Sequence, residues 1–296
     1  MTEFAYCRLQ PSGHKVGYVS RGTGPLVIFL HGFPDTHRGF LPAMDAVAAI
    51  GFHAVAPEPR GYAPTDIPAD GDYRVEAFAK DVLGIADALG AQRFSIVGHD
   101  WGALTAYAVS NLAPGRVDRL ITAAVPHTGH FLLNIRLHQA LRSRYMALFQ
   151  LRGIAERVAS RDNFAYIERL LHTWSPTWDF DETVMGPLRA AYADRPRLTA
   201  ALSYYRGLAP SLVSAESRRL IFSPVSTPTR MIFGTEDGCI GPELFRDQRR
   251  RFQRPLDLVP MVGSGHFMHW EQPDEFIEQI ISFIGDMDSV TPVPPV

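Results

Sequence analysis

The chain has 296 residues, of which 46% are hydrophobic and 20% are charged, and its formal net charge at pH 7 is −2. These proportions are typical of a soluble globular enzyme and exclude a disordered chain. Because the net charge is close to zero, we expect neither a nucleic acid nor a membrane as a partner.

Two cysteines, Cys7 and Cys239, lie near opposite ends of the chain, which favours neither a disulfide framework nor a cysteine metal site. Residues 1–10 lack the basic and apolar regions of a signal peptide, and no apolar run is long enough to span a membrane. We therefore predict a cytoplasmic location. The proline-rich tail, residues 289–296, is expected to fray.

Short apolar, β-branched runs alternate with helical stretches over the first part of the chain. The runs expected to form buried parallel strands are residues 26–30, 53–56, 94–97 and 119–125. Apolar residues recur at helical spacing from Arg74 to Leu89, and Gly90 ends that helix. A further helix begins near Gly102. This alternation predicts an α/β protein with a parallel sheet that helices cover on both faces.

The pattern changes after Pro126. From there to Ser214 the sequence contains helical segments and no convincing strand. Strand patterns return at residues 230–234 and 256–262, and a last amphipathic helix begins near Pro273. We therefore predict a core made of residues 1–126 and 215–296. Residues 127–214 would form a helical cap over the carboxyl edge of the sheet, where such folds bind ligands.

The strand predicted at residues 94–97 runs directly into the sequence Gly98-His99-Asp100-Trp101-Gly102, and a helix follows. This pattern is typical of a nucleophile elbow, with aspartate where esterases have serine. Glycine is needed on both sides because neighbouring backbone approaches too closely for a larger side chain. A carboxylate with an ordinary pKa of about 3.9 is already ionised at neutral pH. Asp100 is therefore predicted to attack carbon directly and form an alkyl ester, rather than only to cap the helix.

Polar residues also follow the two strands predicted near the end of the chain. His266 comes just after the last strand and is the predicted base, which activates the water that hydrolyses the ester. Asp237 follows the strand before it and is the predicted acid, which fixes the tautomer of the imidazole, with Glu236 as an alternative. The histidines form no HExxH or comparable pattern, so we predict no metal and no cofactor, and expect His99 and His269 to be structural.

Three motifs together resemble the epoxide hydrolases of the α/β-hydrolase fold: His31-Gly32-Phe33-Pro34, Arg60-Gly61-Tyr62 and Gly98-His99-Asp100-Trp101-Gly102. The resemblance extends over nearly the whole chain. It implies a mostly parallel eight-stranded sheet with the helical cap inserted after the sixth strand. It also implies an oxyanion hole made by the backbone N–H groups of Phe33 and Trp101, which would stabilise the oxyanion formed on Asp100 when water attacks the ester.

The epoxide hydrolases carry two cap tyrosines that donate hydrogen bonds to the epoxide oxygen and protonate the departing alkoxide. The segment Ser203-Tyr204-Tyr205-Arg206 resembles the family's aromatic-Tyr-Arg segment and implies this role for Tyr205, with Tyr204 as the alternative. A looser similarity around Tyr145 implies the second donor. A phenol with a pKa of about 10 is protonated at neutral pH and can give its proton to an alkoxide. Either tyrosine could instead be a packing residue.

The resemblance implies a small apolar epoxide and water as substrates, and a monomer or a homodimer. The predicted substrate pocket includes His31, Pro34, Trp174 and Tyr204, with Phe131 and Tyr192 as further apolar candidates.

Other functions are possible for this combination of motifs. Haloalkane dehalogenases share the fold and the aspartate nucleophile. The tyrosine pair favours the epoxide hydrolases over them, as does Phe33, where some dehalogenases have an asparagine. An ester or lactone hydrolase is disfavoured because a carboxylate that attacks an ester would produce an anhydride. A non-catalytic receptor is disfavoured because every catalytic role has a candidate residue.

Overall fold

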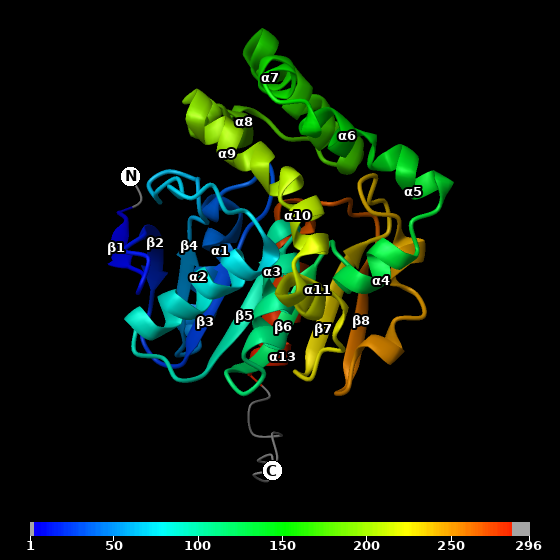
Figure 1. The fold of residues 1–296 in the computed structure, drawn as a ribbon. Helices are drawn as coiled ribbons and strands as arrows, with labels where there is room; N and C mark the ends of the chain where they lie inside the picture. The colour runs from blue at the N-terminus through cyan, green and yellow to red at the C-terminus, as the bar shows by residue number, and fades with distance from the viewer. Residues whose placement is uncertain (1–2, 286–296) are drawn as a thin grey trace.

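The computed structural model describes residues 3–285, and the predicted frayed tail lies outside them. Eight strands form one sheet in the order β1-β2-β4-β3-β5-β6-β7-β8 (Figure 1). The strands are β1 (Ala5–Arg8), β2 (Lys15–Arg21), β3 (Leu26–Leu30), β4 (His53–Pro57), β5 (Phe94–His99), β6 (Val117–Ala123), β7 (Thr229–Gly234) and β8 (Leu256–Met261). Strand β2 is antiparallel to β1 and β4, whereas all later pairs are parallel. The predicted mostly parallel eight-stranded sheet is confirmed.

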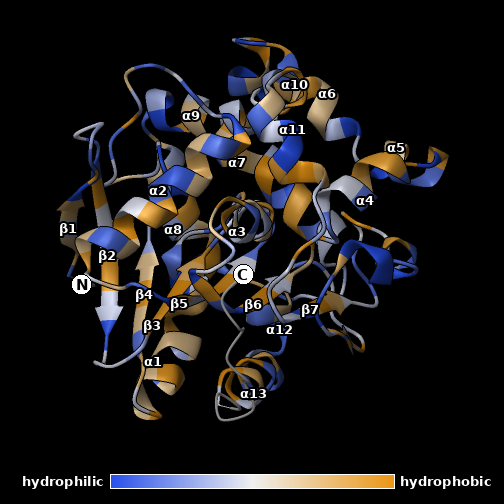
Figure 2. Cartoon of the chain, turned by 60° about the horizontal axis from the view of Figure 1, so that its bottom comes forward, coloured by the Kyte–Doolittle hydropathy of each residue, from blue (hydrophilic) through white to orange (hydrophobic). Residues whose placement is uncertain are grey.

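Helices cover both faces of the sheet, which is why its central strands are continuously apolar. All five residues of β3 are buried, and they alternate between two hydrophobic clusters, Ile28 in one and Val27 and Phe29 in the other. The first cluster contains residues of α2 (Val75–Ala88) and α3 (Trp101–Leu112). The second contains residues of α1 (Leu41–Ala49) and α13 (Pro273–Ile284). Figure 2 shows the hydrophobic residues gathered on the central strands.

Four elements differ from the sequence-based expectation. Strands β1 and β2 were not predicted, because three of the four β1 residues are exposed and its composition carries no apolar alternation. Helix α1 was also not predicted. Strand β6 ends at Ala123 rather than at residue 125, because Ala124 adopts a φ of +63°, which turns the chain out of the sheet.

Helices fill the chain between β6 and β7. They are α4 (Thr128–Leu133), α5 (Leu137–Arg142), α6 (Arg144–Gln150), α7 (Ile154–Trp174), α8 (Glu182–Tyr192), α9 (Arg195–Arg206), α10 (Leu208–Val213) and α11 (Ala215–Phe222). Figure 1 shows α6 to α9 above the carboxyl ends of the strands, whereas α11 returns to pack against α2 and α3. This arrangement suits the predicted cap, although the boundaries of a core and a cap stay a prediction. No helix among residues 3–285 is long and apolar enough to cross a membrane.

Candidate active site

Asp100 occupies the sharp turn between β5 and α3. Its φ of +52° is unusual for a residue with a side chain, and the carboxylate is almost fully buried. The glycines on either side are sterically required. A Cβ atom at Gly98 would lie 2.4 Å from the carbonyl oxygen of Gly102, and one at Gly102 would lie 1.8 Å from that of Leu30. The local sequence therefore fixes the strained turn that presents the carboxylate.

The carboxyl ends of β7 and β8 bring an acid and a histidine to this turn. His266 Nε2 lies 3.6 Å from Asp100 Oδ2, and His266 Nδ1 lies 2.8 Å from Asp237 Oδ2. The other oxygen of Asp237 accepts hydrogen bonds from the backbone N–H groups of Cys239 at 2.7 Å and Ile240 at 2.9 Å. Glu236 is exposed. The geometry of a triad is thus met by Asp237 and not by Glu236.

The two carboxylates control the protonation of His266. Burial by itself lowers the pKa of His266, but the charges of Asp237 and Asp100 outweigh it and raise that pKa to about 10. The imidazole is therefore a cation at neutral pH. Its Nε2 atom is buried and has no hydrogen-bond partner within residues 3–285.

Backbone amides lie where an oxyanion hole is expected. The Phe33 N–H, in the loop after β3, donates to Asp100 Oδ1 at 2.8 Å. A Cβ atom at Gly32 would lie 2.3 Å from the same oxygen, so this close approach needs glycine. Trp101 is the first residue of α3, and its N–H is one of the helix-terminal amides that have no intrahelical acceptor. One of the two predicted oxyanion-hole amides, Phe33 N–H, thus already contacts the Asp100 carboxylate in the structure.

Two tyrosine side chains from the helical segment lie opposite Asp100. Tyr145 of α6 and Tyr205 of α9 have ring centroids 5.5 Å apart. The Tyr205 hydroxyl is buried and, in the described part of the chain, has no hydrogen-bond partner, whereas the Tyr145 hydroxyl lies 3.5 Å from Cys239 Sγ. Burial raises the pKa of both hydroxyls well above their ordinary range, and the charge of Asp100 raises it further. Both phenols are therefore protonated at neutral pH.

Asp100 and the two tyrosines share one cavity of about 60 Å³. Asp100, Tyr145 and Tyr205 line it, and Thr128 and Ser143 are its other polar residues. The remaining lining residues are Trp101 and the apolar Leu104, Val125, Phe131, Leu132, Met146, Leu208 and Ile240. A carboxylate and two phenols thus face the same largely apolar space.

The family is decided by comparison with known proteins. The model of the alpha/beta hydrolase fold family matches residues 25–273. Epoxide hydrolase 2 of Siraitia grosvenorii is 32% identical over 319 residues, an alignment that covers 96% of this chain and 99% of that protein. The chain belongs to the epoxide hydrolases of the α/β-hydrolase fold. It is a hydrolase, as the motifs predicted.

Other epoxide hydrolases are similar over the same extent. Epoxide hydrolase 3 of Mus musculus is 29% identical over 287 residues, covering 94% of this chain and 76% of that protein. A crystal structure of a mutant epoxide hydrolase from Bacillus megaterium, complexed with its product, a naphthyloxy-propanediol, has a TM-score of 0.82. It is 25% identical to this chain, covering 95% of this chain and 100% of the other.

Four residues expected in the substrate pocket of this epoxide hydrolase do not line the cavity: His31, Pro34, Trp174 and Tyr204. His31 Nε2 lies 2.8 Å from Glu58 Oε2, and its Nδ1 lies 3.0 Å from the Gly32 carbonyl oxygen, so both ring nitrogens have partners in the protein. The Tyr204 hydroxyl donates to the Arg60 carbonyl oxygen at 2.8 Å. This hydroxyl is therefore bonded to the backbone and does not line the cavity, which favours Tyr205 over Tyr204 as the proton donor.

Trp174 supports the site from outside the cavity. Its ring centroid lies 4.9 Å from that of Tyr145, and its carbonyl oxygen accepts the His266 backbone N–H at 3.0 Å. Tyr192 is also turned away, with its hydroxyl 3.1 Å from that of Tyr62. Phe131 is the one apolar candidate that lines the cavity.

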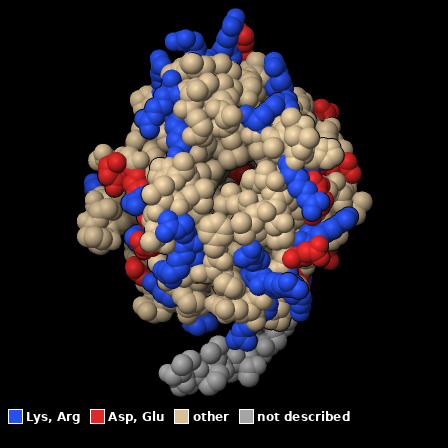
Figure 3. Space-filling model, turned by 45° about the vertical axis from the view of Figure 1, so that its right-hand side comes forward, with Lys and Arg blue, Asp and Glu red and all other residues tan. Residues whose placement is uncertain are grey.

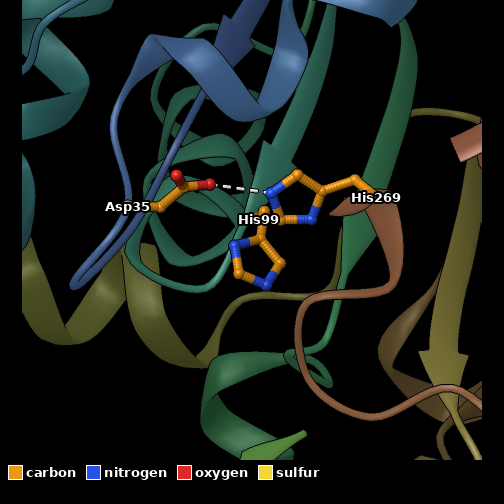
Figure 4. Close-up of side chains that lie close together, drawn as sticks. All are labelled: Asp35, His99 and His269. Atoms are coloured by element: carbon orange, nitrogen blue, oxygen red, sulfur yellow. Dashed lines mark hydrogen bonds and ion pairs between the residues drawn. The ribbon is translucent and has the colours of Figure 1, made fainter. Parts of the chain in front are cut away.

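Three buried side chains lie together beneath the catalytic loop: Asp35, His99 and His269 (Figure 4). Their possible metal-ligating atoms all lie within 4.8 Å of one another. His269 Nε2 is 2.7 Å from Asp35 Oδ2, and the His99 Nε2–H donates to the His266 carbonyl oxygen at 2.8 Å. These nitrogens are therefore used in hydrogen bonds within the protein. The cluster holds the loop that carries His266, which is the structural role expected for both histidines.

Sequence reasoning did not assign a role to Cys239. Its thiol contacts the Tyr145 hydroxyl, and its backbone N–H donates to Asp237, so it joins the acid to a cap tyrosine. Its position two residues after Asp237 was the available signal. A cysteine carries no intrinsic preference for such a contact, however, and only the folded chain shows the thiol beside α6.

Removing either carboxylate should lower the pKa of His266. Because the charge of Asp237 is the largest influence that raises this pKa, Asp237→Asn should lower it more than Asp100→Asn. We expect NMR titration of the imidazole to show a midpoint near pH 10 in the wild type and lower midpoints in both variants. An unchanged midpoint in Asp237→Asn would contradict this electrostatic account.

The raised pKa of His266 makes the free energy of unfolding depend on pH. The folded-state pKa of His266 is above its ordinary value of 6.5, so the stabilisation that its protonation provides is complete below pH 6.5. It is lost as the pH rises through about 10. This loss should be absent when urea unfolding is repeated with Asp100→Asn/Asp237→Asn.

Proposed function

We propose that this protein converts an apolar epoxide to a vicinal diol through an alkyl ester on Asp100, which water activated by His266 then hydrolyses. The observation that carries the proposal is that Asp100, Tyr145 and Tyr205 line one apolar cavity. A nucleophile and two proton donors that face each other across a small space match the two ends of a strained C–O bond. The product bound to the Bacillus megaterium epoxide hydrolase is a diol, which supports the same reaction class.

The first step uses the free oxygen of the nucleophile. Asp100 Oδ1 is held by the Phe33 N–H, so Oδ2 is the atom that attacks an epoxide carbon. The C–O bond of the ring breaks, and Tyr205 or Tyr145 gives its proton to the departing oxygen. Tyr205 is the better placed donor because its hydroxyl has no other partner in the described chain, whereas the Tyr145 hydroxyl contacts Cys239.

Ester formation prepares His266 for the second step. Once Asp100 is an ester it no longer carries the charge that helps to raise the pKa of His266, so that pKa falls. The imidazolium then returns a proton to the tyrosinate and becomes the neutral base. It takes a proton from water, and the hydroxide attacks the ester carbonyl while Phe33 and Trp101 stabilise the oxyanion. Collapse releases the diol and restores the Asp100 carboxylate and the imidazolium.

The reaction itself can be tested with two substrates. The protein should release a diol from a styrene-type epoxide and should release no bromide from a bromoalkane. The two phenols are suited to protonate a departing alkoxide, whereas bromide leaves without a proton. Product analysis by chromatography and a bromide assay give the two readouts. Bromide release without diol formation would replace this proposal with the haloalkane dehalogenase alternative.

The cap tyrosines give a graded prediction. Tyr205→Phe should slow ring opening by about 10²-fold, the typical value of a general acid, because the phenylalanine keeps the packing but has no proton to donate. Tyr145→Phe should slow it less, and the double variant should be nearly inactive. Single-turnover kinetics measure this step. Tyr204→Phe is the matched control, since its hydroxyl bonds to Arg60 outside the cavity. Normal rates in all variants would show that the tyrosines only pack.

A further inference from the structure

Four large apolar side chains lie exposed at the end of α4, in the turn after it and on α5. Leu133, Ile135, Leu137 and Leu141 are 64%, 44%, 76% and 54% exposed, respectively. Leu137 and Leu141 are four residues apart on α5, so they share one face. Single exposed leucines are common, but four within such a short segment form a patch that usually marks an interaction site. We call these four residues the α5 apolar surface.

The charge along this part of the chain has one sign. Residues 120–155 contain no aspartate or glutamate. The cationic side chains of this stretch are Arg136, Arg142, Arg144 and Arg152. Within residues 3–285, Arg142 pairs with Glu243 at 3.5 Å, whereas Arg136 and Arg144 have no carboxylate partner. Glu243 and Asp247, from another part of the chain, line a surface hollow together with Arg136, Arg142 and Arg246. The arginines still outnumber these two carboxylates, so this surface has a local excess of positive charge although the whole chain has a net charge of −2.

The unpaired arginines border the apolar surface. Arg136 lies between Ile135 and Leu137 in the sequence, and the Arg144 Nη1–H donates to the Leu141 carbonyl oxygen at 3.3 Å. Figure 1 shows α5 projecting from the edge of the molecule, and Figure 2 shows hydrophobic residues on it. In Figure 3, which brings this side forward, Lys and Arg side chains lie on several sides of a hollow that has acidic atoms at its base.

The apolar surface begins at the end of a helix that borders the cavity containing Asp100. Phe131 and Leu132 of α4 line the cavity that contains Asp100, and Leu133 is the next residue. A compound that meets the α5 apolar surface therefore lies beside the helix that borders the nucleophile.

We propose that the α5 apolar surface docks on an anionic lipid membrane, with the leucines in the headgroup boundary and Arg136 and Arg144 against lipid phosphates. Apolar side chains together with adjacent arginines are the combination that holds proteins at such surfaces. A second copy of the chain fits less well, because a symmetric contact would bring the arginines of both copies into one interface, where like charges repel each other. The docking does not depend on the proposed reaction. It differs from the expectation of no membrane partner, which came from a charge averaged over the whole chain.

Cosedimentation of the full chain with vesicles tests the proposal. One set of vesicles contains equal parts of phosphatidylcholine and phosphatidylglycerol, and the other contains phosphatidylcholine alone. The wild type should bind the anionic vesicles more tightly, and added salt should weaken that binding. Leu137→Ser/Leu141→Ser and Arg136→Gln/Arg144→Gln should each reduce it by about tenfold or more.

The matched control is Leu258→Ser/Arg254→Gln, which changes exposed residues at β8 and just before it. This control should bind vesicles like the wild type. All variants should keep the wild-type unfolding midpoint, because the replaced side chains are exposed. Absence of binding to anionic vesicles would overturn the proposal, as would an equal loss in the control. A dimer that Leu137→Ser/Leu141→Ser dissociates, without vesicle binding in the wild type, would assign the surface to a second copy.

Discussion

Asp100→Ala is expected to abolish the turnover of every epoxide while the protein stays folded. The substitution removes the only group in the cavity that can form the ester, so no slower route through the same intermediate remains. Diol formation should fall to the uncatalysed background in a discontinuous assay with excess enzyme. Activity within tenfold of the wild type would reject the whole mechanism.

A conservative variant separates chemistry from structure at this position. Asparagine tolerates a positive φ better than alanine and keeps an oxygen that can accept the Phe33 N–H. Asp100→Asn should therefore unfold close to the wild-type temperature and still be inactive, since an amide oxygen is a poor nucleophile. The near-UV circular dichroism spectrum of Asp100→Asn shows whether the variant is folded. Only a folded and inactive variant assigns the loss of activity to the missing carboxylate.

His266→Gln is expected to stop the reaction after its first step. Glutamine has no basic nitrogen, so it spares the attack of Asp100 on the epoxide but cannot activate water. Intact-protein mass spectrometry should show an added mass equal to that of the substrate. Peptide mapping should place this mass between Phe94 and Trp101. Asp237→Asn should show a milder form of the same defect, because a misoriented imidazole keeps some basicity.

The double variant Asp100→Asn/His266→Gln is the control for this experiment. It should gain no mass, because the carboxylate that forms the ester is absent. If His266→Gln folds and binds substrate yet shows no adduct, direct attack of water on the epoxide, with His266 as its base, becomes the better mechanism.

The catalytic turn could be read from the sequence because its geometry is local. A buried strand, two glycines and a following helix leave few conformations for the residue between them, and the contacts made by Gly98 and Gly102 show why. The sequence also indicated which polar residues lie near Asp100, because it shows which of them follow a strand. Parallel strands end at one edge of the sheet, so residues just after β3, β5, β7 and β8 must lie near each other.

Choices between neighbouring residues were left to the tertiary structure. Successive residues on a helix point about 100° apart, so Tyr204 and Tyr205 face different surroundings although they are equivalent by sequence. Tyr204 bonds to Arg60, and Tyr205 lines the cavity. The same holds for the residues predicted to line the substrate pocket, since His31 and Trp174 contact Glu58 and Tyr145, respectively, and do not line the cavity that contains Asp100.

The sequence by itself thus determined the sheet and the positions of the proposed nucleophile, acid and base at its carboxyl edge, because these follow from local patterns and from strand direction. The tertiary structure decided which side of each turn or helix faces Asp100, because side-chain direction depends on packing between segments far apart in the chain. It selected Asp237 over Glu236 by burial, and it placed the Cys239 thiol beside Tyr145. It also left the apolar face of α5 in water, since no other described helix packs over Leu137.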